Sequence, residues 1–153
     1  MSLLLFFVIS ASLPMDVYAT ITTKTTEEES SARIHKIGET ANVGGLDVTV
    51  LSYTVAEDYG EGLRLILHLS IFNHSEEKID VLTNNMKLID QQGKLQPRII
   101  VEGEKAIPTI TIKPAEMYDE KIIFEINDLD MYNFSVRNPF YTGEAHWTIE
   151  LND

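Results

Sequence analysis

The sequence predicts an all-β protein, a sandwich or barrel of short strands in one domain. The clearest observation is residues 63–73, where Leu or Ile occupies every second position from 63 to 71, so a strand would place these side chains on one face. Shorter apolar stretches recur along the chain, separated by turns that contain Gly, Asn or Pro. No stretch beyond the N-terminal segment has helical periodicity, and 153 residues is the length of one domain.

Residues 1–19 are predicted to be a signal peptide. Residues 3–13 form an apolar run interrupted only by small Ser and Ala, Pro14 ends the run, and Val17-Tyr18-Ala19 has the small-x-small pattern of a cleavage site. No Lys or Arg precedes the apolar run, so an uncleaved anchor is the alternative. We expect cleavage after Ala19, which leaves a mature chain without a transmembrane span.

Residues 20–32 are expected to be a disordered linker, rich in Thr and acidic residues, ahead of a folded domain at 33–153. The linker has no apolar periodicity and carries an acidic cluster at residues 27–29. An export signal in a chain without Cys indicates a secreted or cell-envelope protein of a bacterium, because small secreted animal domains usually rely on disulfides.

Within the domain, the first half is expected to contain three strands, at 34–38, 46–55 and 63–73. Gly44-Gly45 supplies the turn before the second strand. The apolar phase of that strand switches near Val50 and Leu51, which predicts a β-bulge and a passage of the strand from one sheet to the other.

The second half is expected to contain strands separated by an Asn84-Asn85 turn and a hairpin at Gly93. Pro97 favours an edge position for the strand that returns from this hairpin. The expected strands are 79–82, 86–90, 95–101, 108–113, 120–126, 134–136 and 145–151.

The charge of the chain excludes some functions and indicates one candidate site. With 12 Lys+Arg against 24 Asp+Glu, the net charge is −12, so we expect no nucleic-acid partner. Acidic loops carry Glu57, Asp58 and Glu61 in one segment and Asp128 and Asp130 in another, and these carboxylates are candidate calcium ligands. The alternative is that both loops are simply solvated, and no cofactor is predicted.

Catalytic patterns are not found in the sequence. The four His residues have no metal-ligand spacing, and there is no Gly-x-Ser-x-Gly elbow, so the chain is not expected to be an enzyme. The two Asn-x-Ser triplets, at Asn73 and Asn133, are expected to have no role in glycosylation. Phe140 and Tyr141 follow Pro139 in a loop and are the candidate partner-binding residues, since exposed aromatic side chains often anchor ligands.

Several turn and strand markers resemble those of the DUF4352 family. They are Ile37-Gly38-Glu39, Gly44-Gly45, the apolar strand that ends in Asn73-His74-Ser75, Leu88-Ile89-Asp90 with Gly93, and Ile112-Lys113-Pro114-Ala115-Glu116. The resemblance implies an immunoglobulin-like antiparallel β-sandwich of bacterial secreted proteins and lipoproteins, and no catalytic residues. The chain departs from the family at Ala115, where Gly is usual, and in lacking the Cys that carries the lipid.

Together these observations predict a non-catalytic binding or interaction module of the cell envelope. Its expected partner is a protein or another envelope component, and the oligomeric state is left open. One alternative is a calcium-dependent or carboxylate-based extracellular hydrolase, which requires a pocket with converging carboxylates. The other is a structural spacer.

Overall fold

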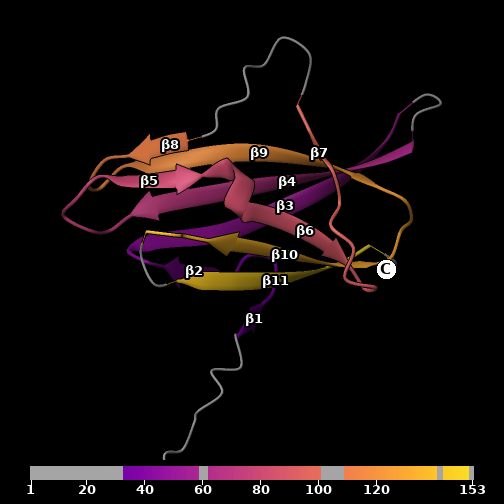
Figure 1. Cartoon of the computed structure of the whole chain (residues 1–153), viewed down its shortest axis with the longest axis horizontal. Coiled ribbons are helices and arrows are strands. Elements are labelled where there is room, and N and C mark those ends of the chain that lie inside the picture. The colour runs from indigo at the N-terminus through magenta and orange to yellow at the C-terminus, as the bar shows by residue number, and fades with distance from the viewer. Residues whose placement is uncertain (1–32, 59–61, 101–108, 141–142, 152–153) are drawn as a thin grey trace, which may run out of the picture.

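A computed structural model describes residues 33–58, 62–100, 109–140 and 143–151 of the chain (Figure 1). The predicted signal peptide and linker lie outside these ranges. Two sheets pack face to face, as the predicted sandwich requires. No helix in the described ranges is long and apolar enough to cross a membrane.

The larger sheet has five strands in the order β2-β3-β4-β9-β7, and all neighbours are antiparallel. The strands are β2 (Thr40–Val43), β3 (Leu46–Asp58), β4 (Gly62–Asn73), β9 (Met117–Ile126) and β7 (Arg98–Ile99). The long β3–β4 hairpin projects beyond the other strands at the upper right of Figure 1.

The second sheet has four strands in the order β1-β11-β10-β6. They are β1 (Ile34–His35), β11 (Glu144–Glu150), β10 (Met131–Arg137) and β6 (Met86–Asp90). The predicted antiparallel sandwich is confirmed, and one short pairing departs from it, because β1 runs parallel to β11. A separate antiparallel ladder joins β5 (Ile79–Leu82) to β8 (Thr109–Ile112), and the predicted Asn84-Asn85 turn is a 3₁₀ helix, η1 (Thr83–Asn85).

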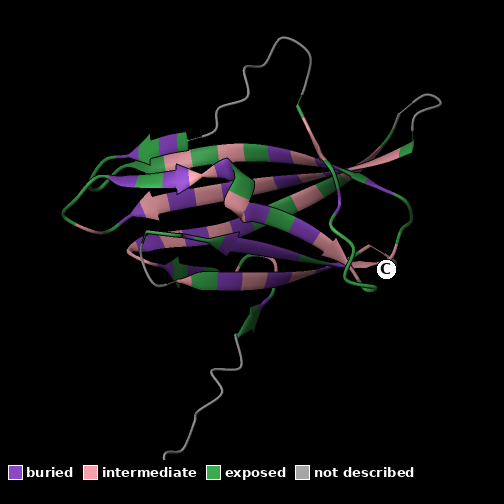
Figure 2. Cartoon of the chain, viewed as in Figure 1, coloured by how far each residue is buried: buried purple, intermediate pink, exposed green. Residues whose placement is uncertain are grey.

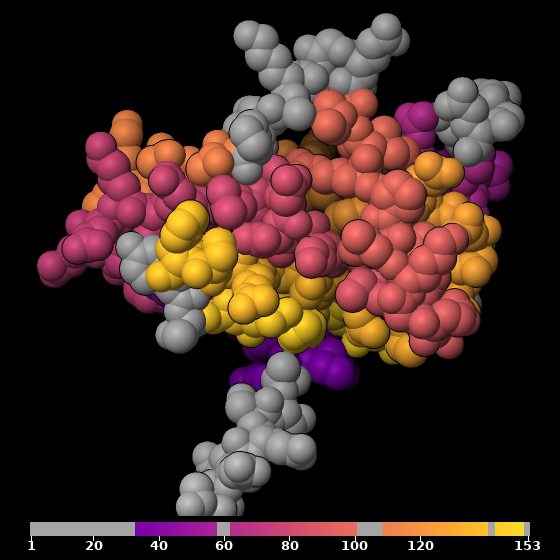
Figure 3. Space-filling model, in the orientation of Figure 1, coloured from indigo at the N-terminus to yellow at the C-terminus, as the bar shows by residue number. Residues whose placement is uncertain are grey.

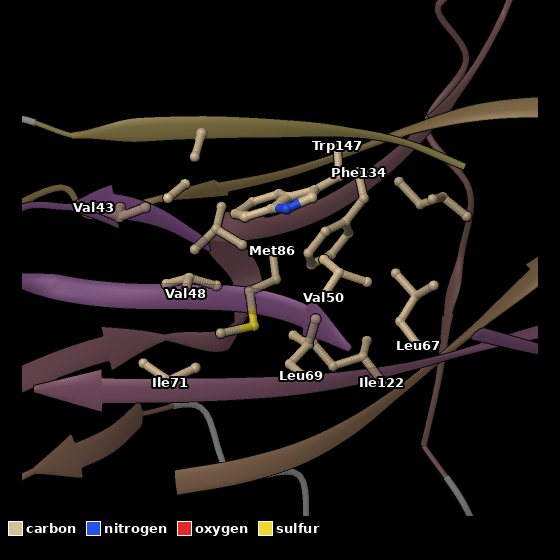
Figure 4. Packing of buried hydrophobic residues seen from close by; sticks show 14 of the residues in the cluster. Val43, Val48, Val50, Leu67, Leu69, Ile71, Met86, Ile122, Phe134 and Trp147 are labelled. Atoms are coloured by element: carbon tan, nitrogen blue, oxygen red, sulfur yellow. The ribbon is translucent and has the colours of Figure 1, made fainter. Parts of the chain in front are cut away.

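The core is built on β4, as the alternating sequence predicts. Leu65, Leu67, Leu69 and Ile71 are buried, while residues of the opposite phase are only partly covered, which gives β4 the alternating stripes seen in Figure 2. Opposite them, the second sheet contributes aromatic side chains from β10 and β11 (Figure 4). Trp147 is fully buried, with its ring centroid 6.0 Å from that of Phe134.

The predicted bulge in β3 is confirmed. The pairing with β4 shifts between Val50 and Ser52, and the inward phase changes from Val48 and Val50 to Tyr53 and Val55. The predicted change of sheet is wrong, because β3 stays paired with β4 from Leu46 to Asp58. One inserted residue reverses the side-chain phase without breaking the ladder.

Two other predicted strands are shorter than expected. The strand at 34–38 ends at His35, and a turn at Gly38, with φ of +85°, carries the chain across to β2 in the other sheet. The strand at 95–101 pairs with β9 only at Arg98 and Ile99, an edge position that agrees with Pro97.

The markers of the family resemblance have structural roles. Asn73 is fully buried: its Nδ2 donates to the carbonyls of Glu77 (2.7 Å) and Ile112 (2.9 Å), and its Oδ1 accepts from the backbone N–H (2.9 Å) and Oγ (2.7 Å) of Ser75. Both amide hydrogens of Asn73 are therefore engaged, and the side chain joins the end of β4 to β8. Ala115, which replaces the usual Gly, has a left-handed φ of +58°, and its N–H donates to the Asn73 carbonyl (2.9 Å).

Tyr132, at the start of β10, forms a contact that is typical of immunoglobulin-like sandwiches. Its ring is buried, and its hydroxyl donates back to the carbonyl oxygen (3.1 Å) and carboxylate (2.7 Å) of Asp128. Burial, with the Asp128 carboxylate as a second cause, raises the pKa of Tyr132 to about 12.

Candidate functional site

The acidic loops lie at the same end of the sandwich. Glu57 pairs with Leu63, and Leu63 pairs with Ile126 on β9, so the end of β3 and the loop after β9 are brought together. The carboxylates of that loop already have protein donors. Asp128 accepts from Tyr132, while Asp130 accepts from Gln91 Nε2 at 2.7 Å and the backbone N–H of Met131 at 2.8 Å.

These carboxylates do not form a metal site within the described part of the chain, where no group of three His, Asp or Glu side chains is placed to hold an ion. Glu61 and the side chain of Asp58 lie outside the described residues. Calcium binding at Glu57, Asp58, Glu61, Asp128 and Asp130 therefore stays a prediction.

Phe140 lies at the opposite end of the molecule, since it follows β10 whereas Asp128 and Asp130 precede it. Its side chain is 66% exposed. Asn138 orders the backbone here, because its Oδ1 accepts from the N–H of Phe140 (3.1 Å) and its own N–H donates to the carbonyl of Gly143 (3.1 Å). Tyr141 lies outside the described residues, so a binding role for this pair also stays a prediction.

The nearest approach to a catalytic constellation is a row on the outer face of the four-stranded sheet. Ser135 pairs across the strands with His146, whose Nε2 lies 3.5 Å from Glu144 Oε1. No hydrogen bond joins Ser135 to His146 within the described ranges. The Ser135 residue is also 7% exposed and sits in the middle of a strand, not on a strand-to-helix elbow. The row therefore lacks the geometry of an activated nucleophile.

The feature that sequence reasoning missed is an open strand edge. β2 pairs with β3 only over Leu46–Thr49, so residues 52–58 of β3 have β4 on one side and no described strand on the other. We call residues 52–58 the β3 edge. In the facing sheet, β1 covers β11 only at His146 and Trp147. Tyr53 closes the gap between the sheets by donating from its hydroxyl to the carbonyl of Glu150 (2.7 Å).

The other described edges are short, covered or charged. β1, β2 and β7 have two to four residues. The outer side of β6 is covered by the segment that follows it, where the Gln96 N–H donates to the Leu88 carbonyl (2.8 Å) and Leu95 bridges to Ile89. In Figure 3 this part of the chain lies at the surface on the right of the molecule.

The first residues of β9 have no described strand on their outer side, and charged side chains protect them against the addition of a further strand. Asp119, Glu120 and Lys121 are consecutive, and Glu120 has the same inward phase as Ile122. Glu120 is held there by the hydroxyl of Tyr118 (2.8 Å). Charged residues, and inward-pointing ones above all, prevent a further strand from adding to an edge.

The β3 edge has little of this protection. Residues 52–56 read Ser-Tyr-Thr-Val-Ala, an uncharged run without Pro in which Tyr, Thr and Val favour strands. Ser52 and Thr54 are exposed. Two features alone oppose the addition of a further strand to the β3 edge. They are the bulge at one end and the acidic residues Glu57 and Asp58 at the other. No periodicity in the sequence reveals this edge, because the edge depends on where β2 stops.

Comparison with solved structures supports the fold. The yjhA protein of Bacillus subtilis superposes with a TM-score of 0.61 at 20% identity, covering 76% of this chain and 100% of that protein. The candidate lipoprotein ycdA of Bacillus subtilis gives 0.60 at 16% identity; the match covers 74% of this chain and 39% of ycdA. An uncharacterized β-sandwich protein of Clostridium difficile gives 0.52 at 11% identity, covering 80% of this chain and 99% of that protein.

The family match covers most of the chain. No curated protein matches the sequence. The model of the domain of unknown function DUF4352, by contrast, matches residues 35–146, which run from β1 into β11 and include every marker of the resemblance. The chain therefore belongs to the DUF4352 family.

Proposed function

We propose that this protein is a non-catalytic binding module of the bacterial cell envelope that takes up an extended segment of a partner protein at the β3 edge. The observation that carries the proposal is the β3 edge itself: an uncharged run on a long strand with no described neighbour on one side. Addition of a strand there would pair the free backbone groups, which provides affinity in known cases of β-augmentation.

The geometry supplies specificity as well. Side chains alternate along the edge, so an added strand would lie beside Ser52 and Thr54 on the outer face and beside Tyr53 and Val55 on the inner face. Glu57 is exposed at the far end, which favours a partner segment with a basic residue in that position.

The envelope location rests on two supports. The first is the predicted signal peptide at residues 1–19. The second is the structural likeness to ycdA, a candidate lipoprotein. A binding module without an enzyme's pocket is also consistent with the lack of a nucleophile, base and metal constellation among the described residues.

The test is a selection of random peptides on residues 20–153, which contain every described strand. Hydrogen–deuterium exchange with each selected peptide bound identifies the amides that it protects. We expect protection at residues 52–58, and at least tenfold weaker binding by Thr54→Lys, because an edge Lys opposes strand addition. Thr109→Lys, the same change at an exposed strand position on β8, is the matched control and should bind normally.

Intact Trp147 fluorescence in both variants would show that they fold. Unchanged binding by Thr54→Lys, or protection confined to the loop at Phe140 instead of the β3 edge, would contradict the proposal.

A further inference from the structure

We infer that this protein forms a dimer through the outer face of its larger sheet, so that the partner on this face is a second copy of the chain. The feature that carries the inference is a row of isoleucines. Ile66 on β4 pairs directly with Ile123 on β9, and Ile123 pairs with Ile99 on β7, so the three side chains lie side by side on one face. We call these three residues the isoleucine row.

The isoleucine row faces away from the core. On β9, Ile122 and Phe124 are buried, whereas Ile123 between them has the opposite phase and is only partly covered. Ile66 alternates in the same way with the buried leucines of β4. Single apolar residues on the open face of an antiparallel sheet are common, but that face is otherwise polar. Three neighbouring isoleucines across adjacent strands make a continuous apolar patch, which is typical of an interaction surface.

The charges beside the row indicate which partner fits it. Lys121 and Glu125 are both exposed, and they lie two residues before and two residues after Ile123, so they share its face. The charge therefore changes sign across the row. A two-fold axis that crosses the strands at the row would place Lys121 of each copy opposite Glu125 of the other. The face is thus complementary to itself, which a surface for an unrelated partner does not need to be.

The surroundings of the row also avoid the repulsion between two acidic chains. The net charge of −12 opposes the approach of two copies over the surface as a whole. In the paired positions that flank the row on β4 and β9, however, Arg64 lies beside Glu125, and His68 lies beside Lys121. This part of the surface is not acidic, so two copies can approach here with attraction between opposite charges.

The spacing of packed sheets suits such a contact. Two sheets pack about 10 Å apart, a gap that the isoleucines would fill at the centre and that Lys and Glu side chains would span together at its margins. The contact area is small, so we expect a weak dimer that dissociates on dilution. Because the contact uses the face of the sheet, the backbone of the β3 edge stays available, and the inference goes beyond the proposed function.

Sedimentation of residues 20–153 over about a hundredfold range of concentration tests the inference, because mass action favours a dimer at high concentration. We expect Ile123→Lys to raise the dissociation constant of the dimer at least tenfold, since it replaces the centre of the apolar row with a charge. Asn133→Lys adds the same charge at an exposed position on the outer face of the smaller sheet. It is the matched control and should dimerise as the unchanged chain does. Intact Trp147 fluorescence would show that both variants fold.

An exchange of charges tests the two-fold arrangement. Lys121→Glu and Glu125→Lys each place like charges opposite one another, so each should weaken the dimer. The double variant restores opposite charges and keeps the net charge of the chain, so it should dimerise as the unchanged chain does. A chain that stays monomeric over the whole range, a dimer that Ile123→Lys leaves unchanged, or a double variant that is no stronger than the single ones would overturn the inference. Peptide binding at the β3 edge is measured separately on Ile123→Lys, so the proposed function stands or fails independently of the dimer.

Discussion

Asn73 is the buried polar residue on which the end of β4 most depends, and its replacement by Ala should be severely destabilising. The substitution removes four side-chain hydrogen bonds, two donated to backbone carbonyls and two accepted from Ser75. At a net contribution of roughly 0.5–1.5 kcal/mol each, and with the Ile112 carbonyl left without its donor, we expect a loss of about 3 kcal/mol. That is a large part of the total stability of a small domain.

The chain supplies a matched control for this prediction. Asn133 occupies the same Asn-x-Ser triplet, but it is exposed and its side chain accepts one bond, from Thr148 Oγ1 at 3.4 Å. Asn133→Ala should cost less than about 0.5 kcal/mol. Asn73→Asp adds a further test, because it keeps the acceptor, loses both donors and directs a carboxylate at two carbonyls, and should destabilise at least as much as Ala.

Urea unfolding followed by fluorescence is the suitable assay. Trp147 is the only Trp and is buried in the opposite sheet, so its emission reports global unfolding. With a typical dependence of about 2 kcal/mol per molar urea, a loss of about 3 kcal/mol lowers the midpoint by about 1.5 M. Equal midpoints for Asn73→Ala and Asn133→Ala would refute the idea that Asn73 stabilises the fold.

Four further predictions concern packing, strain, pH and metal binding. Gly143→Ala should destabilise the fold by about 1–3 kcal/mol, because the added Cβ would lie 2.5 Å from the backbone N of Gly44. Gly93→Ala is the comparison: Gly93 has a φ of +83° and open space around it, so the substitution should cost only about 1 kcal/mol of stability. Thermal melting of the two variants tests the difference. Leu67→Ala should cost about 2–5 kcal/mol in urea unfolding, whereas Leu51→Ala, half exposed at the bulge, should cost little. The contribution of Tyr132 to the free energy of unfolding should be constant below pH 10 and be lost as pH rises from 10 to about 12, because the fold raises the pKa of Tyr132 and so favours its neutral form; an unchanged free energy of unfolding between pH 10 and 12 would contradict this. A calcium titration tests the predicted ligands in the two acidic loops: a rise in melting temperature equivalent to about 2.7 kcal/mol at a hundredfold excess over Kd would establish a site, and an unchanged melting temperature would leave both loops as solvated surface.

The sequence alone predicted the features that depend on local pattern. Strict alternation identified β4 and its buried face, because the two-residue period of a strand appears directly in the order of residues. The phase switch at Val50 and Leu51 predicted the bulge for the same reason. The turn and strand residues that mark the family, such as Asn73 and Gly38, could also be identified in the sequence, but the hydrogen bonds that they form could not be predicted from it.

Other features required the tertiary structure, because they depend on which distant segments become neighbours. The sequence could not exclude a sheet change in β3, since a phase switch is the same whether or not the strand leaves its partner. It also could not show that the acidic loop after β9 lies beside the end of β3, or that Phe140 lies at the other end of the sandwich. The candidate site was the feature that the sequence revealed least. Residues 52–56 have the sequence of an ordinary strand, and one side of that strand is open only because β2 pairs with β3 no further than Thr49. Strand edges are a property of pairing between segments, so the sequence determined every strand of the described ranges except β2, and the tertiary structure decided which of their edges is free.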